Sequence, residues 1–189
     1  GKHIAILFMD FFPRASKRGG AWCGTYRDQT YEKGKKITPV VTIVCNFTKP
    51  AAGEPALLTA DEASTMFHEF GHALHQFFQD VHYQGISNVP RDFVELPSQI
   101  NEHWCFAPEV LKVYAKHYKT GEIMPQSLVE KMERSQKYGQ GFATVEYVAA
   151  SLLDMDWHVL KLVPDDLDVE DFERQTPVKR GLPPQIPPR

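Results

Sequence analysis

The spacing of apolar positions changes near residue 60 of the chain. Before this point apolar residues form short runs, and after it they recur at the three- to four-residue spacing of helices. The run from His3 to Phe12 predicts a buried strand, and the β-branched residues of Pro39 to Phe47 predict another. Six helices are expected, separated by short Gly- or Pro-containing segments: 60–79, 92–106, 108–118, 125–138, 142–162 and 168–180. The pattern predicts a mainly α fold of the α+β class, with a sheet region (1–58) before a helical region (59–189).

Composition and charge exclude several classes of protein. With 42% hydrophobic and 24% charged content, the 189 residues can form one sizeable core. A net charge of −3 without a long Lys/Arg run gives no basis for nucleic-acid or membrane partners. Three separated cysteines, Cys23, Cys45 and Cys105, favour neither a disulfide framework nor a thiolate metal site. They indicate a reducing compartment, and we expect a cytoplasmic protein with no membrane span or secretory signal.

Both ends of the chain have the character of cuts through a longer protein. The first residue, Gly1, is not an initiator Met. The last eight residues, Leu182 to Arg189, contain four prolines and predict an extended connector. We therefore expect 1–189 to be part of a larger domain, truncated at both ends.

One pentapeptide carries metal chemistry. His68-Glu69-Phe70-Gly71-His72 has the pattern His-Glu-x-x-His of zinc peptidases. Residues four apart on a helix lie about 40° apart around its axis, so both imidazoles can bind a single ion. Glu69 then falls beside the ion, where a carboxylate can accept a proton from water. The motif predicts His68 and His72 as ligands and Glu69 as general base.

The surroundings of the motif favour a rigid helix. Thr59 and Glu62 form a capping-box pattern that begins a helix two turns before the motif. Apolar side chains occupy the arc opposite the two histidines: Met66, Phe67, Phe70, Ala73, Leu74 and Phe77. His75 shares the histidine stripe one turn further on, and we expect it to pack or to support a ligand. The alternative from another class is a non-catalytic helical fragment with structural histidines.

The third ligand is not settled by spacing. The longer pattern with a third histidine is absent, because His75 and Phe78 stand where it needs Gly and His. A carboxylate from a later helix is the other common solution. One stripe of the expected helix 92–106 carries four candidates for the metal or its support: Asp92, Glu95, Gln99 and Glu102. Periodicity does not choose among the acidic ones, and acidic stripes are often solvated faces. Pro97, which favours a first turn, allows a later helix start.

The segment Gly19-Gly20-Ala21 lies between the two expected strands and permits close backbone approach. It predicts either a plain glycine bend or an edge along which substrate binds.

Two longer stretches make the chain recognisable. The residues from Phe67 to His75 and from Arg91 to Gln99 closely resemble the thimet-oligopeptidase family of zinc peptidases. The resemblance implies a helical, zincin-like catalytic core with a small antiparallel sheet, and one Zn²⁺ per chain. It also implies Glu95 as the third ligand, with Asp92, Gln99 and Glu102 as residues around the ligands.

The same resemblance implies short oligopeptide substrates. The stretches Lys49 to Leu58 and Ser98 to Trp104 look most like members that release dipeptides from the C-terminus, the peptidyl-dipeptidases. An endopeptidase of the same family is the alternative. In relatives, a segment rich in Gly and Tyr, which also carries a His, follows the equivalent of Arg189 and contacts substrate and transition state. The chain stops before it, so we expect the isolated chain to bind zinc and turn over peptides poorly.

Overall fold

Three strands form the main sheet: β1 (Ile6–Asp10), β5 (Val40–Val44) and β2 (Trp22–Arg27), in the order β1-β5-β2. β5 runs parallel to β1 and antiparallel to β2. The expectation of an antiparallel sheet is therefore wrong, because the main sheet is mixed. Between β1 and β5 the chain forms β2 and a hairpin of β3 (Thr30–Glu32) and β4 (Lys35–Ile37), so it re-enters the sheet in the direction of β1.

The two predicted strands are confirmed in shorter form, but the expectation that the first is buried is wrong, because Ile6, Phe8 and Met9 of β1 are exposed. The strands β2, β3 and β4 were not predicted. Six helices follow the sheet, as expected, within residues 1–182, which are those that this computed structural model describes. Their bounds are α1 (Ala60–Phe77), α2 (Leu96–Cys105), α3 (Pro108–Tyr114), α4 (Gln126–Lys137), α5 (Gln140–His158) and α6 (Val169–Lys179). Most of the proline-rich C-terminal segment lies outside the described residues. None of the described helices has the length and apolar character needed to cross a lipid bilayer.

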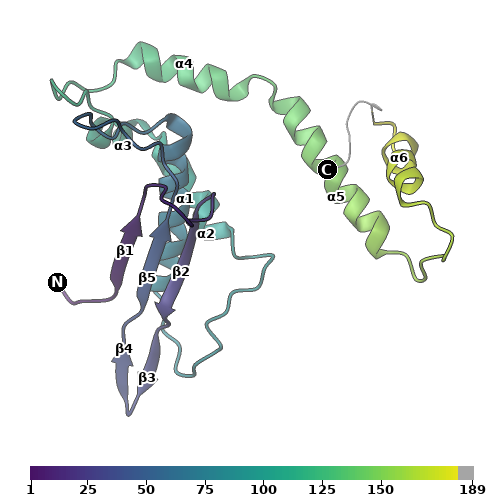
Figure 1. Cartoon of the computed structure of the whole chain (residues 1–189), viewed down its shortest axis with the longest axis horizontal. Coiled ribbons are helices and arrows are strands. Elements are labelled where there is room, and N and C mark those ends of the chain that lie inside the picture. The colour runs from purple at the N-terminus through teal and green to yellow at the C-terminus, as the bar shows by residue number, and fades with distance from the viewer. Residues whose placement is uncertain (183–189) are drawn as a thin grey trace. The chain divides into compact units, whose positions relative to one another are not determined.

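α1 lies along one face of the main sheet, with α2 beside it (Figure 1). The core between sheet and helix contains Val41 and Ile43 of β5 and Ala73 of α1, all fully buried. The predicted apolar arc of α1 packs here, because Met66, Phe70 and Phe77 contact this cluster. The sheet thus holds one side of α1 and leaves the histidine side for other contacts.

The chain divides into two compact units, Gly1–Met124 and Pro125–Arg189. The sheet and the helices α1 to α3 lie in the first. Within the second, α5 and α6 pack through the rings of Trp157 and Phe172, whose centroids are 4.1 Å apart. An ion pair between Arg180 and Asp156, 2.5 Å long, joins the same helices.

Candidate metal centre

The start of α1 is fixed by its capping box. The Thr59 hydroxyl accepts a hydrogen bond of 3.2 Å from the Glu62 amide, and Glu62 Oε2 accepts one of 2.9 Å from the Thr59 amide. Glu62 Oε1 accepts another, 2.7 Å long, from the amide of Thr48 in the segment after β5. A helix with a fixed first turn has a fixed rotational phase, so the cap also decides where His68 and His72 point.

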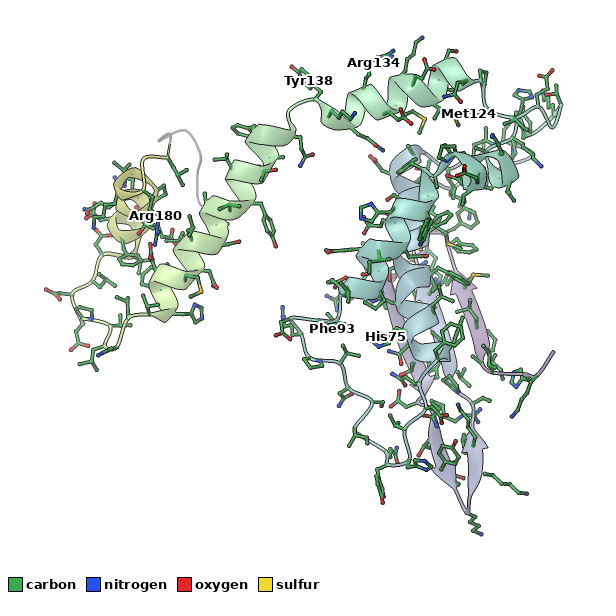
Figure 2. All side chains as sticks on the ribbon, turned by 180° about the vertical axis from the view of Figure 1, so that it is seen from behind. His75, Phe93, Met124, Arg134, Tyr138 and Arg180 are labelled. Carbon is green, nitrogen blue, oxygen red and sulfur yellow. The ribbon has the colours of Figure 1, made fainter. Side chains whose placement is uncertain are left out.

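α2 begins later than the expected residue 92. Its first residue is Leu96, Pro97 lies in the first turn and Glu95 is the N-cap. The later start follows from Pro97, because its ring is compatible with a first turn and clashes in a helix interior. Asp92 therefore lies in the turn before the helix, exposed to solvent. Figure 2 shows its neighbour Phe93 in this segment, which leads into the helix.

α1 and α2 cross with almost no space between their backbones. A Cβ atom at Gly71 would lie 2.6 Å from both the carbonyl oxygen of Pro97 and Cα of Ser98, so only glycine fits there. Nearby, the Asn101 side chain donates a 2.7 Å hydrogen bond to the carbonyl oxygen of Phe67. The close crossing brings the N-terminus of α2 beside the histidine side of α1.

Three side chains from the two helices converge at this crossing. Glu95 Oε2 lies 3.2 Å from His68 Nε2 and 3.1 Å from His72 Nε2. All three ligand atoms lie within 4.8 Å of one another. Ser98 donates a 2.8 Å hydrogen bond to Glu95 Oε2, which holds the carboxylate toward the imidazoles.

This donor set fits zinc. Nitrogen and oxygen ligands about 2.0–2.2 Å from a tetrahedral zinc ion lie roughly 3.4 Å from one another. The observed separations of 3.1 and 3.2 Å are close to that value. Two imidazoles and one carboxylate also leave a fourth tetrahedral position, as in catalytic rather than structural zinc sites.

The protonation of the ligands also suits a metal. Burial lowers the pKa of His72, which favours the neutral imidazole that a metal needs. The hydrogen bond from Ser98 is the largest cause that lowers the pKa of Glu95, and it keeps this carboxylate ionised. At neutral pH these two groups are therefore ready to bind a cation.

Glu69 lies on the same helix but does not join the three converging atoms. Its side chain is only 5% exposed, and within residues 1–182 its buried Oε2 atom has no hydrogen-bond partner. Burial raises its pKa above the usual value for a glutamate, against the charge of His68. A buried carboxylate without partners is costly, which marks this oxygen as one that meets a proton or a ligand.

The other predicted site residues divide into two groups. Glu102 is near the centre, because its Oε1 lies 2.5 Å from His68 Nδ1. Gln99 is exposed on α2, and among the described residues its side chain has no hydrogen-bond partner. His75 is half-buried on α1 (Figure 2) and is not part of the converging group, like the exposed Asp92.

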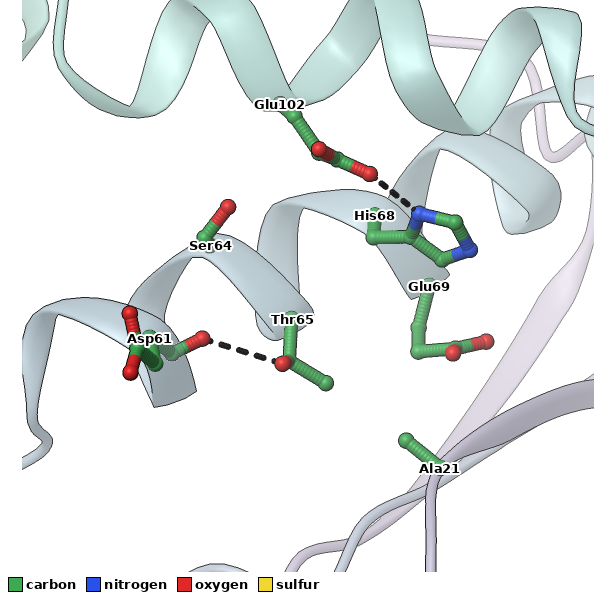
Figure 3. A pocket seen from close by; sticks show the side chains of 7 residues that line it. All are labelled: Ala21, Asp61, Ser64, Thr65, His68, Glu69 and Glu102. Carbon is green, nitrogen blue, oxygen red and sulfur yellow. Dashed lines mark hydrogen bonds and ion pairs between the residues drawn. The ribbon is translucent and has the colours of Figure 1, made fainter. Parts of the chain in front are cut away.

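A cavity of about 440 Å³ opens beside His68 and Glu69. Figure 3 shows Ala21 facing Glu69 across it. Three further residues of α1 line it that sequence reasoning missed: Asp61, Ser64 and Thr65. Helical periodicity could have found them, since they precede His68 by seven, four and three residues and so share its face.

The two glycines before Ala21 form the predicted bend and do not line this cavity. Gly20 has a φ of +87°, which favours glycine. Asn46 donates hydrogen bonds of 2.8 and 2.7 Å to the carbonyl oxygens of Arg18 and Gly20. Asn46 thus fixes the bend that carries Ala21 to the cavity, a link between distant residues that spacing does not indicate.

The site combines two imidazoles one turn apart, a carboxylate from a second helix and a buried carboxylate beside them. This arrangement is typical of one class of protein, in which a helix with the pattern His-Glu-x-x-His binds a metal. Sequence comparison gives the family within this class. The family described as Peptidase family M3 matches residues 1–178. The chain belongs to peptidase family M3.

Individual relatives agree with this assignment. A dipeptidyl carboxypeptidase of Escherichia coli (strain K12) is 47% identical over the whole chain, which spans 28% of the relative's length. Oligopeptidase A of the same organism is 41% identical over 80% of the chain and 23% of its own length. A thimet-like oligopeptidase of Dictyostelium discoideum is 38% identical over 83% of the chain and 24% of its own length. The resemblance to the thimet-oligopeptidase family is therefore confirmed.

Proposed function

We propose that this chain is the zinc-binding core of a peptidase that hydrolyses short oligopeptides. The observation that carries the proposal is the convergence of His68 Nε2, His72 Nε2 and Glu95 Oε2 beside the buried carboxylate of Glu69. Membership of peptidase family M3 supports it. The proposal includes a zincin-like core, in which the main sheet supports the motif helix.

His68, His72 and Glu95 would hold one Zn²⁺. When bound, zinc polarises the scissile carbonyl and lowers the pKa of water towards about 7. Glu69 accepts a proton from the water molecule while the oxygen of that water forms a bond to the carbonyl carbon. As the carbon–nitrogen bond breaks, Glu69 returns the proton to the departing amine. Burial raises the pKa of Glu69, which makes it a stronger proton acceptor than an ordinary glutamate, and a pKa closer to the working pH suits a group that first accepts and then donates a proton.

Substrate would bind along the segment Gly19-Gly20-Ala21, of which Ala21 lines the cavity. Ala21 lines the cavity opposite Glu69, and its short side chain leaves room for a peptide backbone. Asp92 and Gln99 remain predicted support for the ligands, although neither contacts them in the described residues. Cys23, Cys45 and Cys105 are free thiols, which supports the proposed cytoplasmic location.

Metal analysis tests the zinc site. The intact protein that contains this chain should carry one zinc per molecule, and His72→Ala should lose it while Glu69→Gln keeps it. Zinc content unchanged by His72→Ala would contradict the site and favour the non-catalytic reading of the histidines.

We further propose that the peptidase releases dipeptides from the C-terminus. The 47% identity to a dipeptidyl carboxypeptidase supports this specificity, and the 41% identity to oligopeptidase A favours the alternative of cutting internal bonds. Mass spectrometry of the products from one N-blocked peptide separates the two. Successive dipeptides indicate the exopeptidase, and a single internal cut that leaves two larger pieces indicates the endopeptidase.

A further inference from the structure

Glu102 is the only predicted supporting residue that touches a metal ligand among the described residues, and its contact has a defined chemistry. Glu102 Oε1 lies 2.5 Å from His68 Nδ1, and the two residues are 34 positions apart on different helices. Figure 3 shows the carboxylate reaching from α2 to the near side of the imidazole ring. The contact is thus made by tertiary structure rather than by helical spacing.

The two ring nitrogens of His68 face different carboxylates. Nδ1 faces Glu102, while Nε2 lies 3.2 Å from Glu95 Oε2 at the converging group. An ionised carboxylate only accepts hydrogen bonds, so the contact favours the His68 tautomer in which Nδ1 carries the proton. A neutral imidazole then has its lone pair on Nε2, which is the atom directed at the metal position.

Contacts other than the one between Glu102 and His68 also hold α2 against α1. Asn101 donates to the Phe67 carbonyl at 2.7 Å, and the Gly71 backbone packs directly on Pro97 and Ser98. The side chains of His68 and Glu102 are 25% and 38% exposed, and pairs this exposed contribute little to folding. The contact with Glu102 therefore acts mainly on the orientation of the His68 imidazole ring.

We propose that Glu102 is a positioning residue that fixes the tautomer and ring orientation of His68 for metal binding. The inference rests on the zinc site proposed above. Because Glu102 also lines the cavity beside Glu69, it holds the ring at the border between metal and substrate.

Two neutral substitutions of similar length test the proposal. Glu102→Gln keeps an oxygen that accepts a hydrogen bond, whereas Glu102→Met removes it, and both remove the same charge. Zinc affinity would be measured on the intact, metal-free protein by competition with a chromophoric chelator. We expect Glu102→Met to bind zinc about 10–100-fold more weakly than the unchanged protein, and Glu102→Gln to fall between them. The absorption spectrum of the Co²⁺ form should change in the Met variant and remain close to the original in the Gln variant.

Three outcomes are decisive. Equal zinc affinity of the Gln and Met variants would overturn the proposal, because charge alone would then account for the effect. A lower melting temperature of the metal-free Met variant than of the metal-free Gln variant would assign Glu102 to folding, and would also overturn it. Failure of the unchanged protein to bind one zinc would instead refute the proposed zinc site, before any variant is compared.

Discussion

Glu69 has a carboxylate oxygen, Oε2, that is buried with no partner in the part of the chain that the structure describes. This burial makes the folded state less stable, because an ionised carboxylate loses its hydration. The raised pKa of Glu69 has the same cause. This cost to stability is consistent with the proposed role of Glu69 in proton transfer.

Glu69→Gln should therefore abolish peptide hydrolysis and leave the fold and metal intact. We expect kcat to fall by at least about 10²-fold, since general bases contribute 10²–10⁴-fold, while zinc content stays at one per molecule. The melting temperature of the metal-free protein should be equal or higher, because an amide is less costly to bury than a charge. Steady-state kinetics, metal analysis and thermal unfolding check the three expectations.

The matched control is Glu130→Gln, an exposed glutamate of α4. It should change neither kcat nor the melting temperature. Peptide turnover that survives Glu69→Gln would remove Glu69 from the mechanism and leave the metal site unaffected.

At the scale of elements, the crossing of α1 and α2 determines the site. Each helix carries part of the candidate metal centre, and the convergence depends on how closely the two backbones approach at Gly71. α2 meets α1 with small or polar groups, such as Ser98 and Asn101. The large apolar side chains Leu96, Ile100 and Trp104 of α2 are about half exposed, as is Phe93 in the turn before it. Periodicity within α2 does not indicate which of its groups form the contact with α1.

Gly71→Ala should open this crossing. The added Cβ would lie 2.6 Å from backbone atoms, which cannot move aside as a flexible side chain can. We expect a loss of about 1–3 kcal/mol in the free energy of unfolding, the usual cost of overpacking, and weaker zinc binding because Glu95 moves away from the histidines. Denaturant unfolding and zinc titration provide the measurements.

Gly141→Ala in α5 serves as the control for this glycine. A Cβ there meets no atom within 4 Å, so alanine should stabilise by about 0.5–1 kcal/mol and leave zinc affinity unchanged. Unaltered stability and zinc affinity in Gly71→Ala would show that the helix crossing does not control the metal site.

The capping box of α1 should give stability that depends on pH. Hydrogen bonds from the amides of Thr48 and Thr59 lower the pKa of Glu62 below 4.5. A lowered pKa in the folded state means that the stabilisation is complete above 4.5 and disappears as pH falls through the folded value. Glu62→Ala should thus cost about 1 kcal/mol at pH 7 and progressively less below pH 4.5.

Thermal unfolding of both proteins at several pH values measures this difference. Glu54→Ala, which changes an exposed glutamate outside the helix, should show no such trend. A stability difference that stays constant from pH 7 down to pH 3 would contradict the role of the Glu62 carboxylate.

At the scale of the whole molecule, a bound metal would join two helices of the first unit. All three predicted ligands lie in Gly1–Met124, and none lies in Pro125–Arg189. A ligand that binds only the folded state stabilises it by mass action, about 2.7 kcal/mol at a free concentration of 100 times its Kd. Zinc should therefore stabilise the first unit.

Removal of zinc by a chelator should lower the melting temperature and increase hydrogen exchange in α1 and α2. Exchange in α4, which carries no predicted ligand, should stay the same. His72→Ala should melt at the same temperature with and without zinc. An equal change of exchange in α4 and α1 would contradict a site confined to the first unit.

The sequence by itself determined the chemistry of the motif helix. The spacing of His68, Glu69 and His72, the capping box and the opposite apolar arc all follow from 3.6 residues per turn, which is a local property of the chain. The same local logic predicted six helices and two strands. It missed β2, β3 and β4, because short strands gain their stability from pairing with distant partners rather than from their own residues.

Only the tertiary structure decided which groups meet. Spacing left Asp92, Glu95 and Glu102 as equal candidates for the third ligand, and the resemblance to a family was needed to prefer Glu95. In the structure the choice depends on the late start of α2 and its close contact with Gly71. These bring Glu95 to both histidines and Glu102 to the other nitrogen of His68, and leave Asp92 in solvent. Contacts between residues about 30 positions apart depend on how helices cross, and periodicity within one helix carries no information on that crossing.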